Sequence, residues 1–205
     1  MKPFPSFILA SKSPRRREML TEAGYRFRAV APRVSEPAYI PPGVPPAQLA
    51  EALAYFKARS VAEILPREIV LGADTVVTSA RRTFGKAADA GEARYMLRGL
   101  SGMCHSVTTG LAILTPAPPG RTRPCRYIAS DTTVIVMRHL SDEEIDAYVA
   151  SGEWRDKAGA YAIQETADAF VDHIEGSYTN VVGLPMELLE RMLGNVRRDM
   201  EKDED

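Results

Sequence analysis

Hydrophobic and polar positions along the chain follow two alternating periods. Short apolar runs rich in β-branched residues predict strands, whereas apolar residues three or four positions apart predict helices. We expect strands at Phe7–Ala10, Ile69–Val77, His105–Leu114, Tyr127–Met137, around Tyr161 and at Phe170–Ile174. We expect helices at Pro14–Ala23, Ala47–Leu65, Asp89–Leu100, after Ser141 and from Pro185 onward. This alternation is typical of an α/β protein in which helices cover a mixed sheet.

Punctuating residues mark the boundaries of these elements. Ser141 and Glu144 have the spacing of a capping box, and Gly152 is placed to end the helix that follows. The segment Thr115–Arg126 holds four prolines and one glycine, so it predicts a loop between two strands. Neither an internal repeat nor a linker interrupts the pattern, and we expect one domain over residues 1–205.

Composition narrows the possible functions. The chain has 205 residues and is 45% hydrophobic, enough for a substantial core. Lys plus Arg (26) nearly balance Asp plus Glu (27), which argues against a nucleic-acid track or an anionic membrane surface as partner. Any site for an anion must therefore be local.

The cellular location is predicted from two further features. Cys104 and Cys125 lack the spacing of a zinc site and suit a reducing compartment. The apolar stretch from Met1 to Ala10 is interrupted by Pro3 and Pro5, which argues against a signal peptide. No run reaches the ~20 apolar residues of a spanning helix. We expect a cytoplasmic protein.

The first chemical signal is a basic turn between the first strand and the first helix. It reads Ser11-Lys12-Ser13-Pro14-Arg15-Arg16. A helix N-terminus offers free N–H groups to phosphate, and serine hydroxyls and arginines add further donors. Arginines there oppose the positive end of the helix dipole, and a bound polyanion would resolve the conflict. A solvated basic turn explains the motif equally well.

The second signal is a carboxylate within an apolar strand. Asp74 and Thr75 follow Gly72 and Ala73 inside Ile69–Val77. Burying such a carboxylate is costly unless it is paired, binds a metal ion or takes part in chemistry. This favours a functional aspartate over one that caps a turn at the strand end.

Three lysines stand in unusual places. Lys57 falls on the helical stripe of Leu53 and Val61, Lys86 follows Gly85, and Lys157 lies in a stretch rich in glycine and alanine. With Arg15 and Arg16 they would supply the charge needed to neutralise a triphosphate. Alternatively, Lys57 extends its ammonium group to solvent along an apolar face.

His105 and Gln164 each stand beside an apolar strand. A lone histidine at the start of a strand is most often structural, and we interpret His105 in this way. Gln164 follows Ala160–Ile163, where its amide could read the donor and acceptor groups of a base. A structural role for Gln164 is the alternative.

Several ordered motifs together resemble the Maf family of nucleotide pyrophosphatases. The resemblance extends from about Ile8 to Leu189. The motifs that carry it are Leu9-Ala10-Ser11-Lys12-Ser13-Pro14-Arg15-Arg16, Leu71-Gly72-Ala73-Asp74-Thr75-Val76-Val77, Gly85-Lys86, Leu100-Ser101-Gly102, His105-Ser106-Val107-Thr108-Thr109-Gly110, Asp156-Lys157-Ala158-Gly159-Ala160-Tyr161-Ala162-Ile163-Gln164, Gly176-Ser177-Tyr178 and Val181-Val182-Gly183-Leu184-Pro185.

The resemblance implies a fold and a reaction. The fold would be α/β and similar to inosine triphosphate pyrophosphatases, with a mixed twisted sheet flanked by helices and two lobes around a cleft. The reaction would be hydrolysis of a nucleoside triphosphate between the α and β phosphates, with Mg²⁺ or another divalent cation such as Mn²⁺. Dimers are reported for the family, which leaves a homodimer open.

The resemblance also implies roles for individual residues. Asp74 would accept the proton of the attacking water, and Lys57 and Lys86 would be catalytic with it. Asp74 and Glu36 would hold the metal ion. The residues expected to bind substrate are Ser11, Arg15, Arg16, Thr75, Lys157 and Gln164.

Base preference in the family is thought to follow the positions of Arg15, Thr75 and Gln164. This trio resembles the branch that acts on dTTP and UTP, and differs from the branch that acts on 7-methylguanosine triphosphate. Trp154, beside the lysine motif, departs from the family pattern and could alter the loop near the cleft or stack on a base. Two alternatives stay open: a pyrophosphatase that removes modified nucleotides, and a nucleotide-binding regulator of septum formation.

Overall fold

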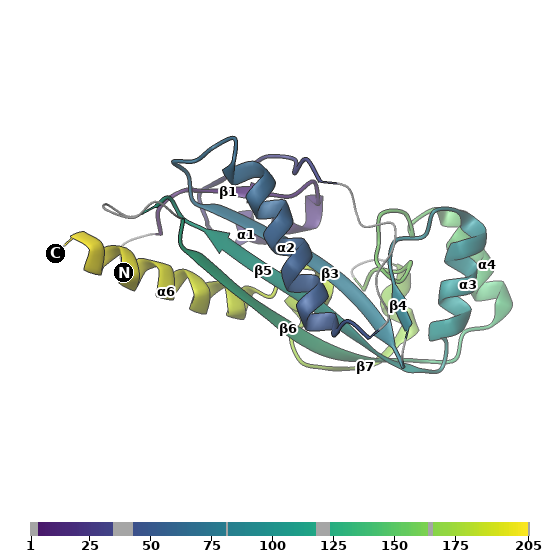
Figure 1. Cartoon of the computed structure of the whole chain (residues 1–205). Coiled ribbons are helices and arrows are strands. Elements are labelled where there is room, and N and C mark those ends of the chain that lie inside the picture. Colours follow the sequence, from purple (N-terminus) through teal and green to yellow (C-terminus); the bar gives the residue numbers. More distant parts are fainter. Residues whose placement is uncertain (1–3, 35–42, 81, 118–123, 164–165, 205) are drawn as a thin grey trace.

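The computed structural model describes residues 4–34, 43–80, 82–117, 124–163 and 166–204. Within this part of the chain, seven strands form one mixed sheet in the order β2-β1-β3-β5-β6-β7, with β4 paired to β3 (Figure 1). β1 runs parallel to β2 and β3, and the other pairs are antiparallel. The strands are β1 (Phe7–Ala10), β2 (Phe27–Ala29), β3 (Val70–Ser79), β4 (Arg82–Phe84), β5 (Cys104–Leu114), β6 (Arg126–Met137) and β7 (Val171–Glu175).

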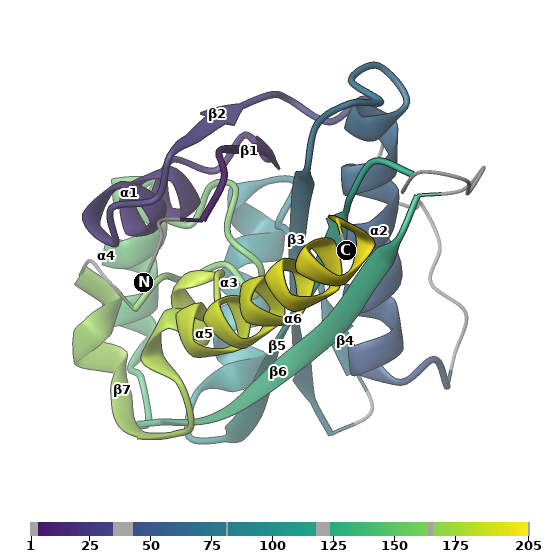
Figure 2. The ribbon, with the colours of Figure 1, turned by 90° about the vertical axis from the view of Figure 1, so that its left-hand side faces the viewer.

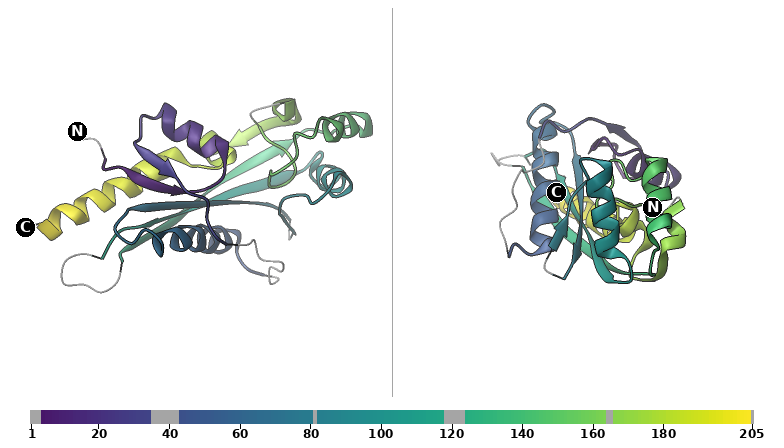
Figure 3. Two further views of the ribbon diagram at one scale, coloured as in Figure 1. Left: turned by 90° about the horizontal axis from the view of Figure 1, so that it is seen from above. Right: turned by 90° about the vertical axis from the view of Figure 1, so that its right-hand side faces the viewer.

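Helices cover both faces of this sheet. α2 lies against one face, whereas α1 and α6 lie against the other, and α3 and α4 pack together at the far end of the long strands (Figure 3). Figure 2 shows α6 crossing in front of the long strands. The helices are α1 (Pro14–Glu22), α2 (Pro46–Ala62), α3 (Ala90–Leu100), α4 (Asp142–Ser151), α5 (Tyr178–Val182) and α6 (Met186–Glu204), with a 3₁₀ helix at Thr166–Phe170.

The predicted fold class is confirmed: the protein is α/β, with a mixed sheet flanked by helices. The capping box of Ser141 and Glu144 is present, and Gly152 ends α4 in the left-handed region. The strand predicted around Tyr161 is wrong. Ala160 has φ +60°, which breaks an extended run; residues 159, 160 and 163 lie in turns, and residues 161–162 have no regular structure. None of the described helices is long and apolar enough to cross a membrane.

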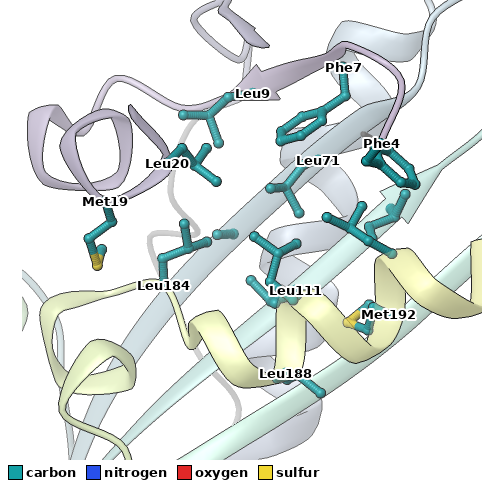
Figure 4. Packing of buried hydrophobic residues seen from close by; sticks show 14 of the residues in the cluster. Phe4, Phe7, Leu9, Met19, Leu20, Leu71, Leu111, Leu184, Leu188 and Met192 are labelled. Atoms are coloured by element: carbon teal, nitrogen blue, oxygen red, sulfur yellow. The ribbon is translucent and has the colours of Figure 1, made fainter. Parts of the chain in front are cut away.

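A large apolar core fills the space between the sheet and helices α1 and α6. Phe7, Leu71 and Leu111 point into it from three strands, and Leu20 and Leu188 meet them from the two helices (Figure 4). The opposite face is thinner. There, small residues of α2 such as Ala54 and Ala58 pack directly on the strands.

A second large core lies at the other end of the same long strands. It joins Val77 of β3 and Ile135 of β6 to Leu97 of α3 and Tyr148 of α4. Between the two cores, the inward face of the strands carries threonines instead of aliphatic residues. Thr75 lies opposite Thr109 in the register of β3 and β5. The sheet is therefore apolar at both ends and polar in the middle.

The polar middle coincides with a gap in strand pairing. β5 lies along one edge of β3, and β1 pairs with the other edge only as far as Gly72. β4 pairs with that edge from Val77 onward. Among the described strands, none pairs with the stretch from Ala73 to Val76 on this side. Asp74 and Thr75 therefore lie where the edge of the sheet is open.

Candidate active site at the edge of β3

An ion pair joins β3 to α2 at the open edge. The ammonium of Lys57 donates to Oδ1 of Asp74, and the two side chains are 15% and 11% exposed. The sequence patterns single out Lys57 and Asp74 separately, and the structure shows that their side chains are in contact. Because the pair is largely shielded from water, the attraction between the ammonium and the carboxylate is weakened less than it would be at the protein surface.

Two glycines allow α2 to approach the sheet this closely. A Cβ atom built on Gly72 would lie 2.3 Å from the carbonyl oxygen of Ala54, and one on Gly110 would lie 2.3 Å from the carbonyl carbon of Ala50. Gly110 is directly opposite Asp74 in the strand register. The absence of side chains at these positions sets the distance at which Lys57 reaches Asp74.

The basic turn folds as the start of α1. Ser13 caps the helix by accepting a hydrogen bond from the N–H of Arg16, and Pro14 occupies the first turn. Ser11 is buried, and its hydroxyl accepts from the N–H of Ser13 at 3.1 Å. The first turn of α1 contains no acidic residue, so its positive end lacks a charged partner from that turn.

Arg16 binds mainly to protein groups. Its guanidinium donates to the carbonyls of Gly183 (2.7 Å) and Ala73 (2.9 Å). It also donates to the hydroxyls of Thr75 (3.1 Å) and Ser11 (3.4 Å). Four of its five N–H groups are engaged in this way. Burial lowers the pKa of Arg16, and Arg15 lowers it further, whereas the negative charge of Asp74 raises it.

Lys86 and Lys157 come together beyond β4. The backbone of Lys86 forms a β-bridge with Ala158, next to Lys157, and the N–H of Gly159 donates to the carbonyl of Gly85 at 3.0 Å. A Cβ atom on Gly159 would lie 3.2 Å from Val77, so this loop packs on β3 where its open edge ends. Lys157 is 8% exposed. The two lysines therefore flank the open edge from the side opposite α1.

Thr75 belongs to a line of hydrogen bonds that the sequence does not predict. Its Oγ1 lies 2.9 Å from that of Thr109, and Thr109 donates to the carbonyl of Asn180 at 3.0 Å. Asn180 is fully buried. Its amide nitrogen donates to Val107 and Thr133, both at 2.9 Å. In the sequence, this line of hydrogen bonds is indicated only by polar residues that interrupt the apolar pattern of the paired strands.

A metal ion could bind at Asp74. Glu36 lies outside the described residues, as does Gln164. The described residues contain no cluster of three or more His, Cys, Asp or Glu side chains. Mg²⁺ commonly binds through one or two carboxylates together with substrate phosphates and water. The buried carboxylate of Asp74, beside cationic groups suited to phosphate, fits that kind of site.

Two aromatic side chains near Lys157 have structural roles. Trp154 is 4% exposed within the second core, and its Nε1 donates to the carbonyl of Val149 at 3.0 Å. The prediction that it could stack on a base is therefore wrong. His105 Nε2 lies 2.6 Å from the hydroxyl of Tyr161, and both residues are buried. This bond ties the Lys157 loop to β5.

Comparison with known proteins adds independent findings. A family model described as Maf-like protein matches residues 6–196. A dTTP/UTP pyrophosphatase of Pelotomaculum thermopropionicum is 45% identical over 91% of this chain and 94% of its own length. Proteins of the same description from Geobacter sp. (strain M21) and Bacillus cytotoxicus are 46% and 44% identical. These cover 88% and 91% of this chain, and 90% and 93% of the relatives.

Proposed function

The chain belongs to the Maf family, and from that premise we propose that it is a pyrophosphatase that converts dTTP and UTP to the monophosphate and pyrophosphate. The observation that carries this proposal is the shielded pair of Lys57 and Asp74 at the open edge of β3. The pair lies on the open stretch of β3, between Arg16 of α1 and the loop of Lys86 and Lys157, which supports a role in phosphoanhydride hydrolysis.

Asp74 would act as the general base. Its carboxylate takes a proton from a water molecule as the water attacks the α phosphorus in line with the departing pyrophosphate. Lys57 donates to Oδ1, which orients the carboxylate and leaves Oδ2 for the water. The narrow approach of α2 over Gly72 and Gly110 fixes that geometry.

The phosphates would bind between α1 and the two lysines beyond β4. The N–H groups in the first turn of α1 and the hydroxyl of Ser11 lie on one side of the open edge, and Arg15 in that turn would bind phosphate with them. Lys86 and Lys157 lie on the other side and would receive the charge that develops on the leaving pyrophosphate. Arg16 would bind substrate through its one remaining N–H group while it holds Thr75 in place.

A divalent cation would be needed for activity. Asp74 and Glu36 would hold Mg²⁺, or Mn²⁺ in its place, together with phosphate oxygens of the nucleotide. Such an ion neutralises phosphate charge as it accumulates on the reacting oxygens. Thr75, Arg15 and Gln164 would set the preference for thymine and uracil. We also propose a cytoplasmic location, a homodimer and no nucleic-acid partner.

Product analysis tests the proposal. The purified protein is incubated with Mg²⁺ and a panel of standard and modified nucleoside triphosphates, and the products are separated. We expect dTMP or UMP together with pyrophosphate. A nucleoside diphosphate with orthophosphate would exclude cleavage between the α and β phosphates. A purine or a modified nucleotide as best substrate would overturn the base preference, and binding without turnover would favour a regulatory protein.

A further inference from the structure

Thr109 lies in the middle of β5, and the proposed reaction does not use it directly. Its side chain is fully buried. Its Oγ1 is 3.0 Å from the carbonyl oxygen of Asn180 and 2.9 Å from Oγ1 of Thr75. Nη2 of Arg16 is 3.1 Å from the same Thr75 oxygen. A single line of hydrogen bonds therefore runs from Arg16 through two threonines to a backbone carbonyl.

The direction of this line follows from the chemistry of its two ends. A carbonyl oxygen can only accept and a guanidinium can only donate, whereas each threonine hydroxyl has one proton. The proton of Thr109 points at Asn180, since two oxygens 3.0 Å apart with no proton between them would repel each other. Thr75 must then donate its own proton to Thr109.

Thr75 is left with one free lone pair. Its proton is used by Thr109, and one of its two lone pairs accepts from Arg16. Thr75 is partly exposed at the open edge of β3, so a ligand can reach it. Toward a ligand this hydroxyl is an acceptor only. It cannot donate to a phosphate oxygen or to a base carbonyl while the line is intact.

Both ends of the line are held in place. Arg16 is fixed by the carbonyls of Gly183 and Ala73. Asn180 is fixed by the two hydrogen bonds of its side-chain amide, to Val107 and Thr133. The carbonyl of Asn180 also accepts from the N–H of Gly183 at 3.0 Å. Reversal would therefore leave this carbonyl one donor, but it would place the oxygens of Thr109 and Asn180 3.0 Å apart with no proton between them, which is unfavourable.

We propose that Thr109 is a positioning residue that holds Thr75 as a pure hydrogen-bond acceptor, so that Thr75 recognises an N–H or O–H donor of the nucleotide. This inference rests on the proposed function, which supplies the substrate. Two donors are shared by dTTP and UTP: the N3–H of the base and the 3′-hydroxyl of the sugar. Cytosine has no N3–H.

Removal of the Thr109 hydroxyl tests the proposal. Thr109→Val keeps the shape of the side chain but lets the Thr75 hydroxyl rotate. We expect KM for UTP and dTTP to rise about 5- to 30-fold, as for one lost hydrogen bond, with kcat within twofold. Thr109→Ser keeps the hydroxyl and should restore KM to within about threefold. An unchanged KM in Thr109→Val, or an equal defect in Thr109→Ser, would overturn the proposal.

Thr108→Val is the matched control. Thr108 immediately precedes Thr109 in β5. It is buried to a similar degree, and its hydroxyl contacts that of Thr132 at 3.0 Å. It points to the opposite face of the sheet and takes no part in the line. Its KM for UTP should match that of the unchanged protein, which separates the loss of this line from a general loss of a buried hydroxyl.

Substrate analogues test the same point without a substitution. If Thr75 accepts from N3–H of the base, 3-methyl-UTP should bind at least about fivefold more weakly than UTP. If Thr75 accepts from the 3′-hydroxyl of the sugar, 3′-deoxy-UTP should bind at least about fivefold more weakly than UTP. Equal binding of both analogues and UTP would overturn the inference. Binding is measured by calorimetry alongside pyrophosphate release. Failure of the proposed function appears as absent release from UTP, whereas failure of this inference appears in the dissociation constants.

Discussion

Nζ of Lys57 on α2 donates to Oδ1 of Asp74 on β3, and the two side chains are 15% and 11% exposed. A pair so shielded holds its geometry with little competition from water. Because only Oδ1 is engaged by Lys57, the other carboxylate oxygen can act on a ligand.

Asp74→Asn should abolish turnover and preserve nucleotide binding. The amide keeps the size of the carboxylate but cannot take a proton, so kcat should fall about 10²- to 10⁴-fold. The dissociation constant for UTP, measured by calorimetry, should change less than tenfold. Asp146→Asn is the control, because Asp146 is exposed and pairs with Arg94 on the surface. A kcat near that of the unchanged protein in Asp74→Asn would remove Asp74 from the role of base.

Lys57→Met should reduce both activity and stability. The variant leaves the carboxylate of Asp74 partly buried without this cation, so the free energy of unfolding should fall by about 1–3 kcal/mol and kcat at least about 100-fold. Urea unfolding and pyrophosphate release measure the two effects. Lys202→Met removes a lysine that pairs with Asp199 but is 75% exposed, and should change stability by less than about 0.5 kcal/mol. Equal effects of the two variants would contradict the role of Lys57.

Gly110→Ala and Gly194→Ala should shift stability in opposite directions. A methyl group at position 110 would lie 2.3 Å from the backbone of Ala50, so α2 must move, at a cost of about 3 kcal/mol and with loss of activity. Gly194 lies within α6, and a methyl group there would meet no heavy atom within 4 Å beyond the backbone of its own helix. Alanine at this position should stabilise by about 0.5–1 kcal/mol. Thermal unfolding of both variants checks the signs.

Stability should fall on acidification because of His105. Burial lowers the pKa of His105 to about 4, whereas the unfolded value is near 6.5. Below 6.5 the unfolded chain binds a proton that the folded protein excludes, so stability decreases as the pH falls and levels off near pH 4. We expect a loss of about 2–3 kcal/mol from this group.

Comparison of histidine variants isolates that effect. His105→Gln should reduce the difference in unfolding free energy between pH 7 and pH 4.5. His173→Gln should leave the difference unchanged, because His173 is 59% exposed. The measurement is urea denaturation of the three proteins at both pH values. If His105→Gln keeps the full pH dependence, the titrating group lies elsewhere.

The sequence predicted the elements whose signal is local. Four consecutive apolar residues predicted β1, and the spacing of Ser141 and Glu144 predicted the start of α4. β2 and β4 were missed, because three-residue strands such as Phe27–Ala29 are stabilised by their neighbours more than by their own pattern. The apolar run at Tyr161 predicts a strand, because a buried turn and a buried strand can have the same composition.

The candidate site was predictable residue by residue but not as an arrangement. Asp74 stands out as a carboxylate in an apolar strand, yet its pairing with Lys57 depends on the approach of α2 over Gly72. The sequence predicts that Arg16 binds phosphate, and it gives no sign that four of its five N–H groups also bind protein groups. Sequence identifies the charged groups, whereas tertiary packing decides which partner each one meets.

The two glycines beneath α2 also restrict the register that β3 can adopt during folding. A slip of β3 by one residue would exchange its faces, so that Ala73 or Leu71 would point at α2 where not even a methyl group fits. The same slip would turn Asp74 away from Lys57. A misaligned chain therefore cannot close α2 onto the sheet, and a chain that closes has Asp74 beside Lys57. The correct register of β3 and the position of Asp74 therefore depend on the same two glycines, Gly72 and Gly110.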